Sequence, residues 1–162
     1  MTAPMDLDVP TPLGTVHRGE DQLPWVDLDA NVKIKLVHVN RHDGLWITHN
    51  RMLPGTRVQT HTHTGHVFAF TLSGSWHYLE SADDMNRAGS YLFEPAGSTH
   101  TLAVPEDSDG PADVWFAIYG PLLNLDADGN VETVVDCATA LAMYREASRE
   151  QGHGTPNVYV EG

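Results

Sequence analysis

Short segments in which apolar and polar residues alternate make up most of the chain, and each is bounded by Gly, Pro, Asp or Asn. A period of two, in runs rich in β-branched and aromatic residues, is typical of half-buried β-strands. The segments are residues 32–40, 44–53, 64–72, 74–80, 89–95, 99–105 and 113–120. Several short strands at this spacing predict a β-sandwich or barrel.

The alternation also divides the side chains of each strand between two faces. In the first segment it places Val32, Ile34 and Leu36 on one face of a strand, and Val37 and Val39 on the other. Aromatic residues of the later segments are expected to lie mostly between the two sheets. They are Phe68, Phe70, Trp76, Tyr78, Tyr91, Phe93, Trp115, Phe116 and Tyr119.

The length of 162 residues suits one filled hydrophobic core, so we predict a single domain over 1–162. Residues 1–30 are rich in Pro, Asp and Gly and predict an irregular arm, followed by a β-barrel core over 31–135. Residues 137–151 predict a helix, because helix-forming residues dominate and Gly152 follows as a stop. A tight turn is expected within 124–131.

Charge limits the partners. The chain has 9 Lys and Arg against 22 Asp and Glu, a formal charge of −13, which repels nucleic-acid backbones and anionic lipid headgroups. We therefore expect neither nucleic acid nor membrane as a partner. The sequence shows no signal-like start and no long apolar run, which predicts a soluble, cytoplasmic protein. With Cys137 as the single cysteine, any bound metal must use nitrogen and oxygen ligands.

A candidate metal site lies in the stretch THTHTGH. His61 and His63 are two residues apart, so both imidazoles point to the same face of an extended chain. His100 follows a Pro95-Ala-Gly97 turn that could bring a later strand beside this pair. Imidazole suits Fe(II), Ni, Cu, Mn or Zn, and hardly suits Mg or Ca.

These residues resemble the two motifs of the cupin superfamily. Five residues separate Gly55 from His61-x-His63, with Gly74 later, and five residues separate Gly89 from Pro95-x-Gly97-x-x-His100. The resemblance implies an all-β cupin fold, a double-stranded β-helix or jelly-roll β-sandwich, here with a C-terminal helix. It also implies that His61, His63 and His100 are metal ligands.

Two positions depart from the cupin motifs. Val67 stands where the first motif usually has a glutamate ligand, and Val104 where the second usually has asparagine. The predicted site therefore has three histidines and lacks the glutamate ligand of the motif. This ligand set differs from that of many sugar isomerases and resembles that of the three-histidine cupin dioxygenases.

Longer stretches are similar to the 2,4'-dihydroxyacetophenone dioxygenases and, more distantly, to the acetylacetone-cleaving dioxygenase. They are THTHTGHVFAFTLSGSWHYLE, GSYLFEPAGSTHTL and VWFAIYGPLLNLDADGNV. The resemblance implies Fe(II), with Zn, Ni, Cu or Co possible in the isolated protein. It also implies that O2 cleaves a C–C bond next to the carbonyl of an aromatic 2-hydroxy ketone. For 2,4'-dihydroxyacetophenone the products are 4-hydroxybenzoate and formate.

Glu94 is the candidate catalytic residue. It lies six residues before His100 on one strand face with Ser90 and Leu92, and the resembling dioxygenases have a glutamate near the metal at this position. It could move a proton, orient a ligand, or only form a strand-end hydrogen bond. His66 is out of phase with the ligand pair and is expected at the rim. Substrate-pocket candidates are Arg57, Gln59, Val67, Ala69, Tyr78 and Val104.

Two other functions stay open. One is a cupin dioxygenase acting on a 1,3-diketone or related enolate. The other is a non-catalytic zinc-binding cupin, such as the sensor domain of a zinc-dependent anti-sigma factor. In each case a homodimer or homotetramer is expected, because cupins commonly pair through sheet edges.

Overall fold

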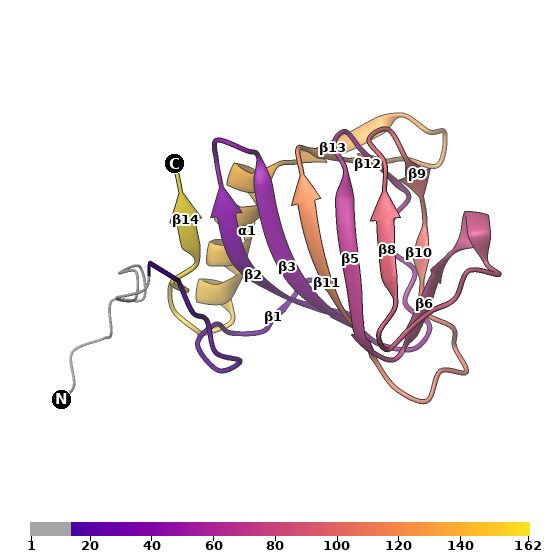
Figure 1. The fold of residues 1–162 in the computed structure, drawn as a ribbon, viewed down its shortest axis with the longest axis horizontal. Coiled ribbons are helices and arrows are strands. Elements are labelled where there is room, and N and C mark those ends of the chain that lie inside the picture. Colours follow the sequence, from indigo (N-terminus) through magenta and orange to yellow (C-terminus); the bar gives the residue numbers. More distant parts are fainter. Residues whose placement is uncertain (1–13) are drawn as a thin grey trace.

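A twisted sheet forms one wall of the molecule in the computed structural model, which describes residues 14–162 (Figure 1). Its neighbouring strands are antiparallel, except that the last strand of the chain runs parallel to β2. In spatial order the strands are β1 (Val26–Asp27), β2 (Val32–Asn40), β3 (Leu45–Met52), β11 (Ala112–Tyr119), β5 (Val67–Ser73) and β8 (Tyr91–Glu94), with β14 (Tyr159–Glu161) beside β2. β1 and β14 were not predicted, and β1 lies within the arm that was expected to be irregular.

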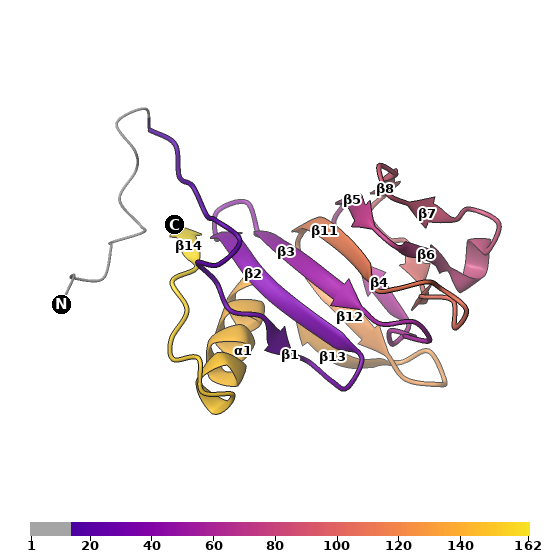
Figure 2. The same cartoon turned by 90° about the horizontal axis from the view of Figure 1, so that it is seen from below.

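The predicted helix forms as α1, Cys137–Glu150, and lies against β1 and β2 (Figure 2). Asp136 caps it, because the Asp136 carboxylate accepts a 2.7 Å hydrogen bond from the Thr139 amide. Leu141 and Tyr144 are buried, as their helical spacing predicts. The helix stops at the predicted Gly152, which has a φ of +82°. Among residues 14–162, no helix is both long and apolar enough to cross a membrane.

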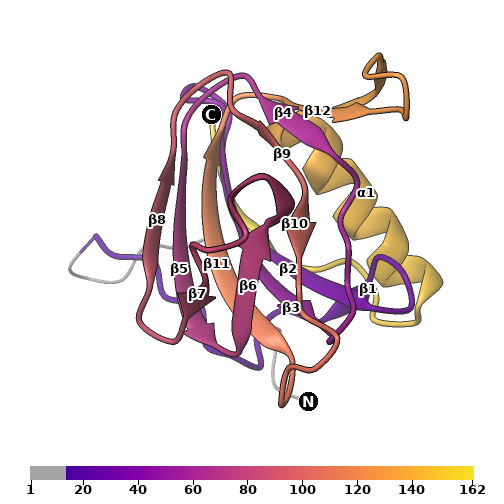
Figure 3. The same cartoon turned by 90° about the vertical axis from the view of Figure 1, so that its right-hand side faces the viewer.

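The opposite wall consists of two smaller sheets, which face the large one (Figure 3). One contains β13 (Val131–Val135), β12 (Leu122–Leu125), β4 (His61–His63) and β9 (Thr99–His100). The other contains β10 (Leu102–Ala103), β6 (Ser75–Tyr78) and β7 (Asn86–Arg87), with a short 3-10 turn, η1 (Leu79–Ser81), after β6. β12 and β13 are joined by the predicted tight turn. The structure thus has the predicted sandwich of antiparallel sheets with one C-terminal helix.

Buried apolar side chains fill the space between the walls. Trp76, Val67 and Val114 are fully buried, and the Trp76 indole donates a 2.9 Å hydrogen bond to the Thr71 hydroxyl. The predicted division of β2 into two faces holds only as far as Leu36. The pairing of β2 with β3 shifts between Leu36 and His38, so Val39 turns into the core on the same side as Leu36, whereas the alternation predicted opposite faces for these two residues.

Part of the aromatic set lies outside the core, which corrects the expectation from sequence. Phe70, Tyr91 and Phe93 are about half exposed, on the outer face of β5 and β8. Strand parity explains this position, because Val67 and Ala69 occupy the inward positions of β5. The sheet therefore presents an aromatic outer face next to its β8 edge.

The described part of the predicted arm packs on the other half of the large sheet, whereas residues 1–13 lie outside the described residues. The Trp25 ring contacts the His49 ring, with centroids 4.6 Å apart. The Lys35 ammonium pairs with the Glu20 carboxylate at 3.0 Å and lies 4.7 Å from the Trp25 ring centre. These contacts cover the outer face of β2 and β3.

Loss of the helix cap should lower stability. We expect Asp136→Ala to lower the free energy of unfolding by about 1 kcal/mol, because the Thr139 amide loses its partner. Urea unfolding would measure this change. Asp136→Asn keeps a capping oxygen and should stay close to the unmutated protein. An equal loss in Asp136→Asn would show that charge, rather than capping, is responsible.

Candidate metal centre

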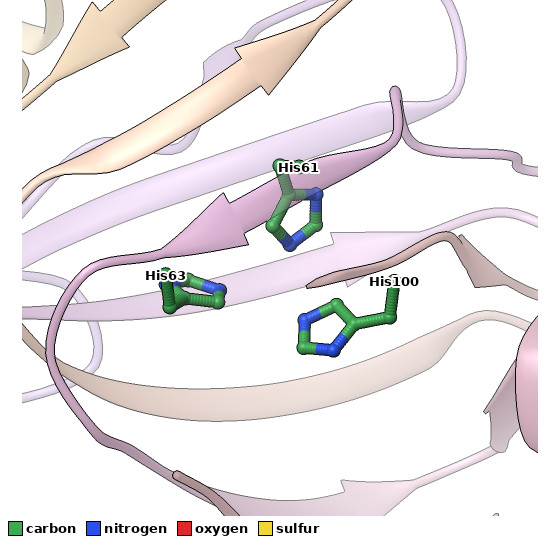
Figure 4. Close-up of side chains that lie close together, drawn as sticks. All are labelled: His61, His63 and His100. Carbon is green, nitrogen blue, oxygen red and sulfur yellow. The ribbon is translucent and has the colours of Figure 1, made fainter. Parts of the chain in front are cut away.

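The three predicted histidines come together at the junction of β4 and β9. These strands pair antiparallel with His61 directly opposite His100, and His63 lies two residues along β4 on the same face. The rings of His61, His63 and His100 point toward one another (Figure 4). All three residues are at most 6% exposed.

The turn between β8 and β9 sets this pairing. Gly97 has a φ of +85°, which favours glycine, and its amide donates a 2.7 Å hydrogen bond to the His63 carbonyl. The His63 amide in turn donates to the Ser98 carbonyl at 3.0 Å. The turn is therefore held against β4, so that His100 enters the site at a fixed place.

The nitrogen atoms have the arrangement that a metal ion needs. One ring nitrogen from each histidine lies within 4.8 Å of the others. Nδ1 of His61 donates a 2.8 Å hydrogen bond to the Gln59 carbonyl, which leaves the Nε2 lone pair for the site. In the described chain, Nε2 of His100 has no hydrogen-bond partner. The donor set thus fits a borderline divalent ion.

Burial also keeps the imidazoles neutral. Desolvation lowers the pKa of His61 and lowers the pKa of His63 to about 4. A neutral imidazole can bind a metal ion, whereas an imidazolium cannot. At neutral pH these two rings are therefore ready to act as ligands.

Glu94 lies directly beside the histidines. It is 3% exposed, and its Oε2 is 3.2 Å from Nε2 of both His63 and His100. Burial alone would raise the pKa of the Glu94 carboxyl, but His100, His63 and the Tyr78 hydroxyl outweigh it and the pKa is lowered. Glu94 is therefore a carboxylate at neutral pH.

Tyr78 holds Glu94 from the other side. The Tyr78 hydroxyl donates a hydrogen bond to Oε1 of Glu94, and the Tyr78 ring stacks on His100 with centroids 3.8 Å apart. Burial and the Glu94 charge raise the pKa of Tyr78, so the phenol stays protonated. Since Oε1 is occupied in this way, Oε2 is the oxygen that faces the histidines.

The position of Glu94 accounts for the missing motif carboxylate. Val67, which stands where cupins usually have glutamate, pairs with Glu94 across β5 and β8. The side chains of two residues that are paired across neighbouring strands lie side by side on the same face of the sheet. The neighbouring strand thus supplies a carboxylate next to the usual position.

A cavity of about 300 Å³ opens beside this cluster, and its wall includes His61, His63, Tyr78 and Glu94. Most of the remaining wall is apolar and comes from β2, β3, β11, β12 and α1. The inward side chains of β3 take part in it. The sequence signal for this part of the wall is the alternation Trp46-x-Thr48-x-Asn50-x-Met52, which was absent from the predicted pocket.

Of the six pocket candidates, Tyr78 lines this cavity. Val67, Ala69 and Val104 are buried in the core instead, as residues that pack the sheets together. Arg57 and Gln59 are exposed beside a separate surface hollow, where the Gln59 amide donates to the Glu132 carboxylate at 2.6 Å. Residues 58–60 leave the strand pairing, so the parity expected from His61 does not extend back to them.

His66 lies apart from the cluster. It is exposed, and its ring contacts Tyr119 on the outer side of the sheet, with centroids 4.5 Å apart. It therefore provides a natural comparison residue for experiments on the metal ligands.

Comparison with known proteins identifies the family. A family model described as the ChrR cupin-like domain matches residues 15–111, more than half of the chain. The chain belongs to the ChrR cupin-like domain family. Among curated proteins, a sequence search finds no match to this cupin.

Solved structures share its fold. A protein of unknown function with a cupin-like fold from Ralstonia eutropha JMP134 is 27% identical, with a TM-score of 0.78 over 91% of this cupin and 96% of that chain. An RmlC-like cupin protein from the same organism is 26% identical, with a TM-score of 0.79 over 87% and 91%. The acetylacetone dioxygenase of Acinetobacter johnsonii is 19% identical, with a TM-score of 0.71 over 82% and 91%, a likeness of fold alone.

Removal of one histidine should abolish tight metal binding. We expect His100→Ala to weaken Co(II) binding by at least about a hundredfold, since even the partners of a ligand contribute 10- to 100-fold. The Co(II) absorption spectrum and metal analysis would measure it. His66→Ala, on the outer side of the sheet, should bind like the unmutated cupin. Retention of Co(II) by His100→Ala would contradict the ligand assignment.

Proposed function

We propose that this cupin is a non-haem Fe(II) dioxygenase that cleaves the C–C bond next to the carbonyl of an aromatic 2-hydroxy ketone. With 2,4'-dihydroxyacetophenone, one O2 is consumed and both of its atoms enter the products, 4-hydroxybenzoate and formate. The observation that carries the proposal is the arrangement of three buried histidines and one buried carboxylate beside a mostly apolar cavity.

His61, His63 and His100 would hold the ion. Three neutral ligands leave its charge uncompensated and leave coordination positions open, which suits an organic anion and O2 together. When bound, iron would supply electron transfer between these two reactants. The same donors also accept Zn, Ni, Cu or Co, so the identity of the metal is part of the proposal.

Glu94 would act as the base. Its carboxylate is ionised and buried, and Oε2 faces the histidines while Tyr78 holds Oε1. It can therefore accept a proton from the substrate as the electron-rich enediolate forms. A positioned base of this kind contributes about 10²- to 10⁴-fold to a rate.

The cavity would hold the rest of the substrate. Its wall is mostly apolar, and about 300 Å³ is enough for a molecule with one aromatic ring. Apolar walls also exclude water, which strengthens the interactions of the Glu94 carboxylate with its neighbours.

Specific observations favour each alternative. The fold likeness to acetylacetone dioxygenase favours a 1,3-diketone as substrate. The ChrR cupin-like family favours a zinc-binding sensor. Structural zinc sites, however, are usually closed by four protein ligands, whereas here the histidines adjoin a cavity.

Oxygen consumption tests the proposal. We expect Fe(II)-loaded protein to consume O2 when 2,4'-dihydroxyacetophenone is added and to form 4-hydroxybenzoate and formate in equal amounts. Glu94→Gln should retain iron while kcat falls by about 10²- to 10⁴-fold. Glu106→Gln, at an exposed position, is the matched control.

The other outcomes separate the alternatives. Uptake with acetylacetone alone would indicate the diketone enzyme. Tight zinc binding without any oxygen uptake would indicate the sensor. Loss of iron in Glu94→Gln would mean that Glu94 holds the metal rather than moves a proton.

We also propose that a second copy of the chain covers the aromatic outer face of β5 and β8. β8 is the edge of its sheet and can pair with its own copy about a twofold axis. The half-exposed Phe70, Tyr91 and Phe93 each leave on the order of 100 Å² of ring surface. Two copies would then bury on the order of 600 Å² from these rings alone, about half of a small stable interface.

Disruption of this face should separate the copies. We expect the double variant Phe70→Ser, Tyr91→Ser to be a monomer by light scattering, whereas the unmutated protein is a dimer or tetramer. Val134→Ser, on the other wall and also half exposed, should keep the oligomer. An unmutated monomer, or an unchanged oligomer in the double variant, would refute this interface.

A further inference from the structure

The cavity wall carries a second polar group, away from the histidine cluster. Thr48 and Asn50 lie on β3 in the large sheet, whereas His61 and His63 lie on β4 in the opposite wall. All four residues line the same cavity. The cavity thus has polar side chains on two sheets, with apolar wall making up most of the rest.

One polar atom of each of these β3 residues, the Thr48 hydroxyl oxygen and Oδ1 of Asn50, is buried. Thr48 is 1% exposed, and within residues 14–162 neither the Thr48 hydroxyl nor Oδ1 of Asn50 has a hydrogen-bond partner. A buried polar group without a partner is destabilising, so such groups are rare in folded proteins. Their position in one cavity wall calls for a physical explanation.

Several other hydroxyl and amide groups of the fold do have partners. The buried Thr71 hydroxyl accepts the Trp76 indole hydrogen bond at 2.9 Å, and the Thr56 hydroxyl donates to the Leu53 carbonyl at 2.7 Å. Asn124 also lines the cavity, but its amide donates to the Thr133 hydroxyl at 2.9 Å. The unpartnered state is therefore particular to Thr48 and Asn50 among these residues.

A ligand hydroxyl group would satisfy both residues. The amide of Asn50 carries an acceptor and a donor, and the Thr48 hydroxyl can play either role. A phenolic hydroxyl both donates and accepts, and its ring is flat and apolar like much of the wall. A methyl or unsubstituted ring would instead leave both protein groups unsatisfied.

We propose that Thr48 and Asn50 form a polar anchor that binds a ring hydroxyl of the substrate, so that the cavity selects hydroxylated aryl ketones. This inference rests on the proposed function for the histidine side of the cavity. The anchor itself binds the ring substituent, and its test does not require turnover.

The binding test uses two ketones that lack the 2-hydroxyl group, 4'-hydroxyacetophenone and acetophenone. Trp46 lines the cavity, so quenching of tryptophan fluorescence can report their binding. We expect the unmutated protein to prefer 4'-hydroxyacetophenone by about ten- to hundredfold, because hydrogen-bonding sites reject analogues that leave them unpaired.

Matched variants distinguish the effect of the Thr48 hydroxyl on binding from the effect of the side-chain volume. Thr48→Val keeps the volume and removes the hydroxyl, whereas Thr48→Ser keeps the hydroxyl. We expect Thr48→Val and Asn50→Leu to lose most of the preference while acetophenone binds as before, and Thr48→Ser to keep it. Melting temperature without ligand is a second readout. It should stay equal or rise in Thr48→Val, because an unpartnered buried hydroxyl contributes no stability.

Failure of the anchor and failure of the proposed function give different results. Equal binding of the two ketones to the unmutated protein, or an unchanged preference in Thr48→Val and Asn50→Leu, would overturn the anchor even if hydroxy ketones are cleaved. A large drop in the melting temperature of Thr48→Val would assign the hydroxyl a structural role and also overturn it. A preference that the variants abolish would support the anchor even if no ketone is oxidised.

Discussion

The antiparallel pairing of β4 with β9 is the interaction on which the site depends. It sets His61 opposite His100, and the period of two along β4 then adds His63 on the same face. A shift of one residue in this register would turn His100 to the other face of the sheet. The Gly97 and Ser98 hydrogen bonds to His63 fix the register at the point where the chain crosses from one wall to the other.

That crossing also delivers the carboxylate. Glu94 ends β8 in the large sheet and His100 ends β9 in the facing sheet, so one short segment supplies both residues from opposite walls. Oε2 of Glu94 and Nε2 of His100 are 3.2 Å apart. This distance depends on the turn between β8 and β9, which backbone hydrogen bonds to His63 hold in place. The replacement of a motif glutamate by Val67 therefore changes the strand from which the carboxylate comes, while a carboxylate remains beside the imidazoles.

Features with a local cause could be predicted from the sequence. Alternation and turn residues predicted the longer strands β2, β3, β5 and β11 and the shorter β6 and β8, and residue type with Gly152 predicted the helix, whereas β1, β7, β12, β13 and β14 were not predicted. The places where the strand pairing shifts or stops could not be predicted from the sequence. The register shift after Leu36 turns Val39 inward, and residues 58–60 leave the pairing so that Gln59 faces away from His61. Alternation assigns the pocket candidates Val67 and Ala69 to one face of β5 and Phe70 to the other, so inward positions for all three were not compatible. Phe70 was misplaced for this reason.

The residues that the prediction missed are those whose role depends on the opposite wall. Thr48 and Asn50 share the inward face of β3 with Trp46 and Met52, and the strand pattern alone gives no reason for polar groups there. Valine has nearly the shape of threonine and would leave no unpartnered hydroxyl in a dry wall. A chain optimised only for stability would therefore place valine at Thr48. A residue that departs from the usual pattern of its strand, with no gain in stability, is expected at a functional position. The polar side chains of β3 are thus better explained by what the cavity binds than by how the sheets pack.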